Sequence, residues 1–254
     1  MDSVSPARAT YFSSARIAVI AMFSTLAGIL YIFNFPIAAA FPSFLEFNFS
    51  DIPALIGTFT VGPVAGVIIT VVKILIKLVV KGTSTVFVGE LSDLVTSCVF
   101  AVTAGLIYSK KRTFKGALIG MAAGMAAEVA VAIIFNWLAL VPFYVQFFFH
   151  GQWQPLINMM TPLFPSCTKE TFYNFYLWAS VLPFNVMRCL AAILVTLPVY
   201  KRLSNLINRF NEKLTPKNDE GGARTKAINL GVLISGLAIV ALLVLFALLR
   251  YFVF

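Results

Sequence analysis

The chain has 254 residues, of which 60% are hydrophobic and 11% are charged, and its mean hydropathy is +0.92. A soluble domain is roughly 45–50% apolar and about 25% charged, so this composition excludes a soluble globular protein with a single core. Apolar runs separated by polar breaks fill most of the chain and leave no room for a soluble catalytic domain. We therefore expect the function to lie inside or beside a lipid bilayer.

The net charge of +9 is distributed in a way that predicts topology rather than a nucleic-acid partner. Most basic residues lie in three short polar segments, which are residues 8–16, residues 110–115 and residues 201–226. The positive-inside rule assigns such segments to the cytoplasm. We therefore expect a protein of the cell membrane whose N-terminus lies in the cytoplasm. Its expected partner is the lipid bilayer, and no nucleic-acid partner is expected.

The residue types that usually bind metals are scarce and scattered. Cys98, Cys167 and Cys189 have no C-x-x-C spacing, and His150 is the only histidine. We predict that the cysteines are inert hydrophobes and that there is no metal site. The chain also lacks a phosphate-binding loop and the sequence motifs of serine hydrolases and zinc proteases, so no catalytic residue is predicted, and the energy for any uphill transport must come from a partner or an ion gradient.

The first half of the chain predicts a long helix, a loop and a short helix. Residues 17–33 form the first apolar run, and residues 35–50 form a loop with two prolines and several aromatics. Ser50 or Asp51 can cap the next helix, whose first turn contains Pro53. Gly62 and Pro63 interrupt this helix after about 10 residues, which cover only half of a ~30 Å hydrocarbon core. Such a half-helix must be buried in protein or line a cavity.

The rest of the chain predicts an all-α integral membrane protein with a six-helix bundle and an additional C-terminal transmembrane helix. Further helices are predicted at residues 63–81, 88–108, 114–141 and 176–200, with Pro142 ending the fifth and residues 146–175 lying outside the membrane. We assign residues 1–206 to the membrane domain, residues 207–227 to a polar cytoplasmic linker and residues 228–254 to the additional helix.

Polar side chains inside these apolar helices are the candidates for chemistry, because each is costly in lipid. They are Glu90, Asp93, Glu128, Asn136, Asn185 and Arg188. Asn185 and Arg188 are three residues apart, which places them on one helix face. Together they suit a planar group with alternating C=O and N–H edges. The alternative is an ion pair of Arg188 with Glu90 or Asp93 that holds the bundle together.

Aromatic and small residues each allow two interpretations. The aromatics near the outer face fit an interfacial belt or, for a few of them, a stacking surface for a flat heteroaromatic ligand. The small residues of the first helix form one face, which suits packing within the chain or docking to another subunit. That face comprises Ser14, Ala18, Ala21, Thr25 and Gly28. For Gly116, Gly120 and Gly124 of the fifth helix we favour packing within the chain.

Four motifs in order resemble a known family. They are FLEFNFSDIPALIG at residues 44–57, GPVAG at residues 62–66, GTST at residues 82–85 followed by GEL at residues 89–91, and LPFN at residues 182–185. Over residues 16–206 the chain resembles the riboflavin-specific substrate-binding (S) component of energy-coupling factor (ECF) transporters. The resemblance implies a six-helix S-component bundle that binds riboflavin and works with a transmembrane coupling protein and two cytoplasmic ATPases. It implies no cofactor in this chain.

The resemblance also implies binding and docking residues. Asn136 and Asn185 match the asparagines that hold the isoalloxazine edge in that family, and Arg188 stands where a lysine is usual. The implied outward pocket lies between the loop after the first helix and the outer parts of the fourth to sixth helices. Its other candidate residues are Glu90, Leu45, Phe49, Thr85 and Phe184. The small face of the first helix would dock on the coupling protein.

Three alternatives stay open at this point. A proton-coupled secondary transporter of a small aromatic vitamin would use Glu90, Asp93 or Glu128 as its proton site. An intramembrane enzyme would need a nucleophile and a base that the sequence does not reveal. Because Arg188 is longer and planar compared with lysine, the ligand can be riboflavin, FMN or a related flavin.

Overall fold

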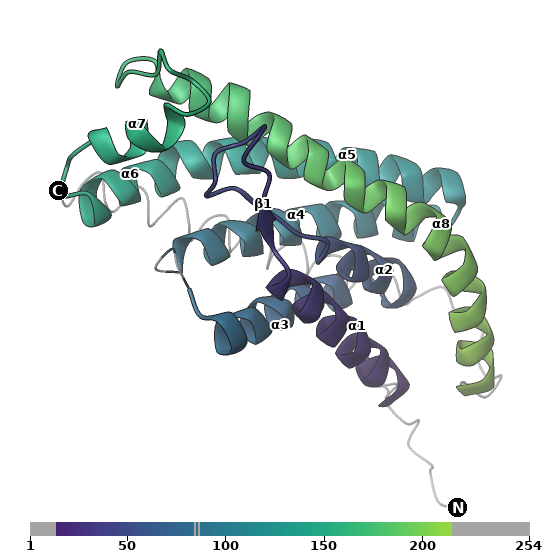
Figure 1. The fold of residues 1–254 in the computed structure, drawn as a ribbon. Coiled ribbons are helices and arrows are strands. Elements are labelled where there is room, and N and C mark those ends of the chain that lie inside the picture. The colour runs from purple at the N-terminus through teal and green to yellow at the C-terminus, as the bar shows by residue number, and fades with distance from the viewer. Residues whose placement is uncertain (1–13, 84, 86, 215–254) are drawn as a thin grey trace, which may run out of the picture.

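The computed structural model describes residues 14–83, 85 and 87–214, and this part of the chain is built almost entirely from helices (Figure 1). The elements in chain order are α1 (Ser14–Ile32), β1 (Phe35–Pro36), β2 (Glu46–Phe47), α2 (Asp51–Val61), α3 (Pro63–Lys81), α4 (Val88–Lys110), α5 (Phe114–Phe135), the π-helix η1 (Asn136–Leu140), α6 (Val141–Phe143), the π-helix η2 (Tyr144–Phe148), α7 (Gln154–Met160), the π-helix η3 (Asn174–Val181) and α8 (Leu182–Leu214).

Within the described residues, four helical segments are long and apolar enough to cross a membrane, which confirms an all-α membrane protein. They are Pro63–Lys81, Val88–Lys110, Phe114–Phe148 and Asn174–Tyr200, and two shorter apolar helices, Arg16–Ile32 and Asp51–Val61, accompany them. The predicted seventh helix, at residues 228–254, lies outside the described residues.

The short helix α2 lies inside the bundle, as its length requires. All of its residues from Asp51 to Phe59 are buried, and it contacts α1, α3, α4 and α8. It ends at Gly62, whose φ of 133° is a conformation that side-chain-bearing residues rarely adopt, and Pro63 then begins α3. The predicted capping bond is absent, because the side chains of Ser50 and Asp51 bind Lys73 of α3 instead.

Glycines of α5 bring this helix close to α4. A Cβ atom on Gly120 would lie 2.7 Å from the backbone oxygen of Ala104, and one on Gly124 would lie 2.7 Å from the ring of Phe100. Such distances leave room only for hydrogen at these positions. The predicted packing of this glycine series within the chain is confirmed for Gly120 and Gly124.

The helix that begins at Phe114 is longer than the sequence predicts. It continues through η1, α6 and η2 to Phe148, so the prediction that Pro142 ends it is wrong. In the π-helical turns the N–H of Val141 bonds to the carbonyl of Asn136, and that of Phe149 bonds to Tyr144, each five residues earlier. These wider turns on both sides allow the chain to pass a proline without leaving the helix.

The last described helix also extends beyond its predicted end. α8 runs to Leu214 with Pro198 inside it, whereas the sequence predicts an end at Tyr200. The helix therefore includes the first residues of the segment assigned to the linker, and the remainder of that segment lies outside the described residues. Figure 1 shows α5 and α8 side by side along the bundle, with the loop that carries β1 crossing in front of them.

The segment between η2 and η3 forms a packed cap at one end of the bundle, which we call the α7 end. Its buried side chains include Leu156, Ile157 and Met160 of α7 and Phe172, and they pack against Val145 of η2. The loop at residues 35–50 is held by the pairing of β1 with β2, in which Phe35 faces Phe47. These two segments enclose the candidate site.

Candidate functional site

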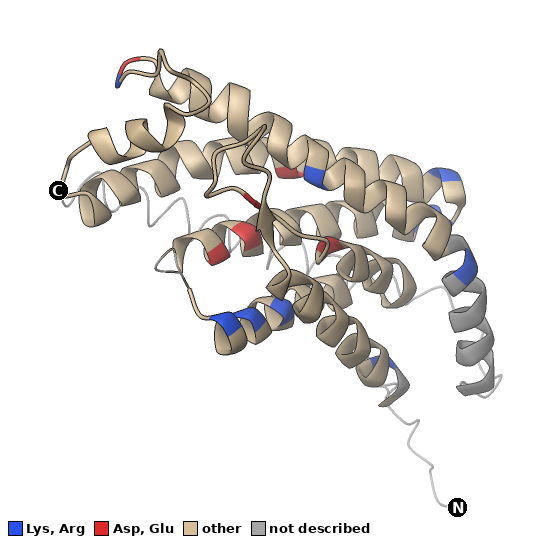
Figure 2. Cartoon of the chain, viewed as in Figure 1, with Lys and Arg blue, Asp and Glu red and all other residues tan. Residues whose placement is uncertain are grey.

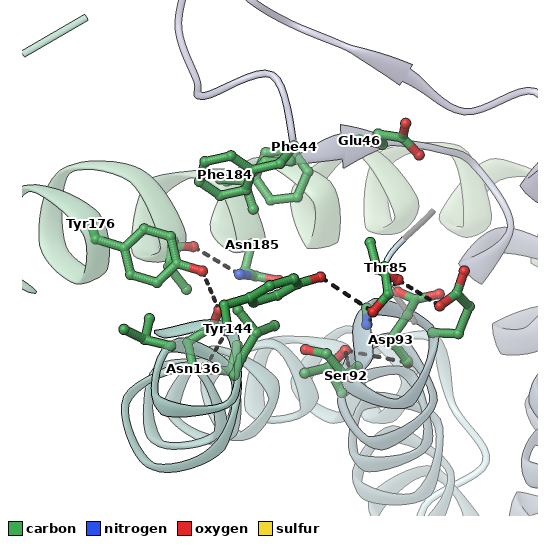
Figure 3. A pocket seen from close by; sticks show the side chains of 18 of the residues that line it. Phe44, Glu46, Thr85, Ser92, Asp93, Asn136, Tyr144, Tyr176, Phe184 and Asn185 are labelled. Atoms are coloured by element: carbon green, nitrogen blue, oxygen red, sulfur yellow. Dashed lines mark hydrogen bonds between the residues drawn. The ribbon is translucent and has the colours of Figure 1, made fainter. Parts of the chain in front are cut away.

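A cavity of about 330 Å³ opens at the α7 end of the bundle (Figure 3). Its walls come from the loop at residues 35–50, from α3 and α4, from the continuous helix of α5, η1 and η2, from the α7 segment, and from η3 and α8. This volume lies in the range of small-molecule sites, roughly 300–1,000 Å³.

Seven of the eight predicted binding residues line this cavity. They are Leu45, Thr85, Glu90, Asn136, Phe184, Asn185 and Arg188. Phe49 is not among the described lining residues. Its side chain is 39% exposed, and its ring lies edge-on against Phe47 with the ring centres 5.0 Å apart.

The two asparagines are held by their own helices. The Nδ2 atom of Asn136 donates to the carbonyl of Ala132 at 2.8 Å, and that of Asn185 donates to the carbonyl of Val181 at 2.8 Å. Each amide therefore uses one N–H inside the protein and retains the other. The hydroxyl of Tyr176 donates to Oδ1 of Asn136 at 2.6 Å, which fixes the direction of that amide.

Figure 3 shows that the amide-bearing and acid-bearing residues occupy different sides of the cavity. Tyr176, Asn136 and Asn185 lie together on one side in this view, and Thr85 and Asp93 lie on the other. Tyr144 lies between them, and its hydroxyl donates to the backbone oxygen of Thr85 at 3.4 Å. The cavity thus carries hydrogen-bonding groups on opposite walls.

Arg188 lines the cavity and also takes part in a buried ion network. Its guanidinium donates to Asp93 of α4 and Glu128 of α5, and its Nη2 atom donates to Thr96 at 3.2 Å. Its Nε atom lies 3.6 Å from Asp51 of α2. The predicted alternative of an ion pair is therefore present with Asp93, whereas Glu90 pairs with Lys77 instead.

Lys73 of α3 is the second cation of this network, and its side chain is 0% exposed. Its Nζ atom lies 2.8 Å from Asp51, 2.9 Å from Ser50 and 3.1 Å from Ser97. It also lies 3.6 Å from Asp93. The two cations and the three carboxylates of Asp51, Asp93 and Glu128 therefore connect α2, α3, α4, α5 and α8 beneath the cavity.

Glu90 belongs to a separate group at the side of the cavity. Its carboxylate pairs with Lys77 and accepts hydrogen bonds from the hydroxyls of Thr83, at 3.0 Å, and Thr85, at 2.7 Å. Lys73 and Lys77 were not predicted as polar partners from the sequence. The available signal was their spacing of four residues in an apolar helix, because a lysine in such a helix needs a partner.

The three cysteines are buried free thiols. Cys189 differs from the predicted purely hydrophobic role, because it makes a polar contact. Burial raises the pKa of Cys167, which lies outside the spanning helices. Cys189 of α8, in contrast, donates from Sγ to Oε2 of Glu128 at 2.6 Å. Cys189 is therefore a polar partner of the ion network as well as a packing residue.

The loop at residues 35–50 is tied to the end of α3. Lys81 donates to the side chain of Asn34, and Asn34 donates to the carboxylate of Glu46. Asn34 and Glu46 both line the cavity. Four lining residues of the α7 end were also not predicted from the sequence, because their aromatic and apolar types are equally typical of a membrane interface. They are Leu156, Met159, Phe172 and Tyr176.

The small face predicted on α1 is exposed along most of its length. Ser14, Ala18, Ala21 and Thr25 are exposed. Gly28 is buried, and a Cβ atom there would lie 2.8 Å from Ile76 of α3. The exposed face therefore ends at Thr25, and Gly28 packs within the chain.

Comparisons with known proteins agree with this architecture. Residues 15–200 match the family model described as ECF transporter, substrate-specific component. The chain is 29% identical over 194 residues to the riboflavin transporter RibU of Staphylococcus aureus, a match that covers 76% of this chain and 93% of that relative. It is 25% identical over 195 residues to the riboflavin transporter FmnP of Bacillus subtilis, covering 76% of this chain and 94% of the relative.

A solved structure is similar in both fold and sequence. The S component of a bacterial ECF transporter superposes with a TM-score of 0.59 and is 28% identical, and the match covers 77% of this chain and 99% of the other.

Proposed function

The chain belongs to the family of substrate-specific components of ECF transporters, and from this premise we propose that its cavity captures riboflavin for uptake into the cell. The protein is a membrane-embedded, multi-pass component of a transporter. We assign it a binding role without chemical conversion of the ligand. The proposal takes riboflavin from the relatives RibU and FmnP, both of which are riboflavin transporters.

The observation that carries the proposal is the pair of amides, Asn136 and Asn185, in one aromatic-walled cavity. The polar edge of a flavin alternates C=O and N–H groups, and an amide offers both a donor and an acceptor. The flat ring system of a flavin fits between aromatic side chains, and the rings of Phe44, Tyr176 and Phe184 line the cavity. Arg188 and Glu90 add a donor group and an acceptor group.

The proposed orientation places the cavity outside the cell and the N-terminus in the cytoplasm. Figure 2 shows basic residues at the turn between α4 and α5, at the end of the bundle opposite α7. These residues are Lys110, Lys111, Arg112 and Lys115. Under the positive-inside rule that end faces the cytoplasm, so the α7 end faces outward. A transmembrane coupling protein and two cytoplasmic ATPases would then complete the importer and use ATP.

The first experiment measures flavin binding directly. The detergent-purified full chain is examined for a flavin absorbance spectrum, and ligand-free protein is then titrated with riboflavin and FMN while flavin fluorescence is recorded. We expect a copurifying flavin or saturable quenching by riboflavin. A colourless protein that quenches neither flavin would contradict the proposal. Uptake into ATP-free vesicles by this chain alone under a pH gradient would favour a secondary transporter instead.

Replacing Asn185 by alanine is expected to weaken riboflavin binding by about 5- to 150-fold. The change leaves polar ring groups of the ligand without a partner, which costs roughly 1–3 kcal/mol. Fluorescence titration of the purified variant measures this loss. The control is Asn158→Ala, because Asn158 is exposed on α7 and is not among the described lining residues. Unchanged affinity in Asn185→Ala would remove Asn185 from the site.

The exposed small face of α1 is proposed as the docking surface for the coupling protein. Changing Ala18 and Ala21 together to tryptophan is expected to stop riboflavin uptake by cells that contain the whole transporter, because bulky side chains prevent close helix approach. Binding by the purified variant should stay within about threefold of the original. The control is Leu194→Trp, a change at a 70% exposed residue of α8. Loss of binding in the α1 variant would show that this face packs within the chain.

A further inference from the structure

The cavity has two chemically different ends, and the binding of the polar ring edge uses only one of them. The amide and charged side chains lie on α3, α4, α8, the start of η1, Asn34 and the loop at residues 35–50. The second end is lined by apolar and aromatic side chains from the end of η2 and the segment that follows it. These are Phe148, Phe149, Leu156, Met159 and Phe172.

The hydroxyl groups nearest this apolar end already have partners. Tyr176 donates to Asn136 at 2.6 Å, and Tyr144 donates to the backbone oxygen of Thr85 at 3.4 Å. The ring of Phe172 stacks on that of Tyr176, with ring centres 5.3 Å apart and an angle of 20° between the planes. A ligand group that needs hydrogen bonds would lose its water here without replacement, so this end selects a hydrocarbon surface.

The helix α7 is a fixed part of this wall. Leu156 and Ile157 are 8% and 9% exposed, and Met160 is 0% exposed, because all three pack in the cluster that contains Val145 and Phe172. Met159 is 43% exposed and lines the cavity. A ligand that fills the cavity would cover this apolar side chain, and the covered area would contribute to binding.

We propose that Leu156 and Met159 of α7, together with Phe172, receive the hydrocarbon end of the ligand and determine specificity for it. This inference rests on the proposed function, in which the ligand is riboflavin. The hydrocarbon end of riboflavin is the benzene ring that carries two methyl groups. Its polar ring edge then faces Asn136 and Asn185, so the ligand lies along the helix from η1 toward η2. The two methyl groups become the features that α7 recognises.

The test compares riboflavin with 7,8-didemethylriboflavin, which lacks only those methyl groups. Affinities are measured by fluorescence quenching for the original chain and for Leu156→Ala, Met159→Ala and Ile157→Ala. One buried methyl group corresponds to about fourfold in affinity, so we expect the original chain to prefer riboflavin by about 4- to 15-fold. Leu156→Ala and Met159→Ala should each reduce this preference to under about threefold.

Ile157→Ala is the matched control, because Ile157 is as buried as its neighbour Leu156 and packs in the same cluster but is not among the described lining residues. It should lower stability as much as Leu156→Ala while keeping the preference for riboflavin. Met159→Ala tests the proposal even where Leu156→Ala fails to fold, because Met159 is largely exposed.

The outcomes separate this inference from the function on which it rests. If the original chain binds neither flavin, the proposed function fails. If it binds riboflavin but the preference is the same in all four proteins, α7 does not contact the methyl groups and the inference is overturned. Equal weakening of both flavins by Leu156→Ala and Met159→Ala would also overturn it, because another part of the ligand would then face α7.

Discussion

Replacing Arg188 by methionine is expected to lower the free energy of unfolding by about 3–5 kcal/mol. The guanidinium contacts Asp93 and Glu128 directly and lies near Asp51, and all three carboxylates are buried. Without Arg188, Lys73 would be the one cation among the described residues that pairs with these carboxylates. The measurement is the thermal unfolding transition of the detergent-purified protein, compared with that of the original chain.

Two further variants identify charge as the cause of this loss. Arg188→Lys keeps the positive charge but loses the planar group whose two Nη atoms donate to Asp93 and Glu128, so it should be less destabilising than Arg188→Met. Adding Glu128→Gln to Arg188→Met removes one uncompensated carboxylate and should recover part of the stability. If Arg188→Met unfolds at the same temperature as the original chain, the network does not stabilise the bundle, and Arg188 serves the ligand alone.

Replacing Lys73 by methionine is expected to have a similar cost of about 3–5 kcal/mol, because it leaves Asp51 buried without its closest cation. Lys73 is not among the described residues that line the cavity. The folded fraction of the variant should therefore bind riboflavin within a few-fold of the original affinity, whereas Arg188→Met should weaken both stability and binding. Thermal unfolding and fluorescence titration of the same preparation separate these effects.

The control for Lys73 lies on the same helix. Lys81→Met removes an exposed lysine that bonds to Asn34, and exposed polar contacts contribute only about 0–1 kcal/mol. The double variant Lys73→Met with Asp51→Asn should be more stable than Lys73→Met alone, because α2 then has no buried carboxylate that has lost its closest cation. A Lys73→Met variant that is no less stable than Lys81→Met would contradict this account.

The runs of apolar residues and the residues that begin or end helices predicted most of the bundle, because both are local properties of the chain. The bounds of α2 and α3 agree with the prediction, since Asp51, Gly62 and Pro63 have strong local preferences at helix ends. The helix ends predicted at Pro142 and Tyr200 are wrong, because both helices continue past these residues. A proline predicts a helix end only if the backbone cannot adjust, and the π-helical turns beside Pro142 depend on packing that one segment does not reveal.

The candidate site was predicted in its polar members and missed in its apolar ones. Asn136, Asn185 and Arg188 stand out because a polar group in lipid is costly and needs a partner or a functional role. Met159 and Phe172 do not stand out, because apolar side chains are equally common in the core, in contact with lipid and in a cavity. The partners within the ion network were also hidden, since Asp51, Lys73 and Arg188 are far apart along the chain and meet only after helices pack.

The sequence by itself determined that this protein lies in a membrane, that it is a bundle of helices that includes a half-helix, and that its motifs resemble those of one transporter family. These properties follow from hydrophobic area, helix-ending residues and short motifs, which all depend on residues that are close together in the sequence. Only the tertiary structure decided that Arg188 pairs with Asp93, that Glu90 pairs with Lys77, and that α7 closes the apolar end of the cavity. Those choices depend on distances between segments, and such distances are fixed by the packing of all the helices together.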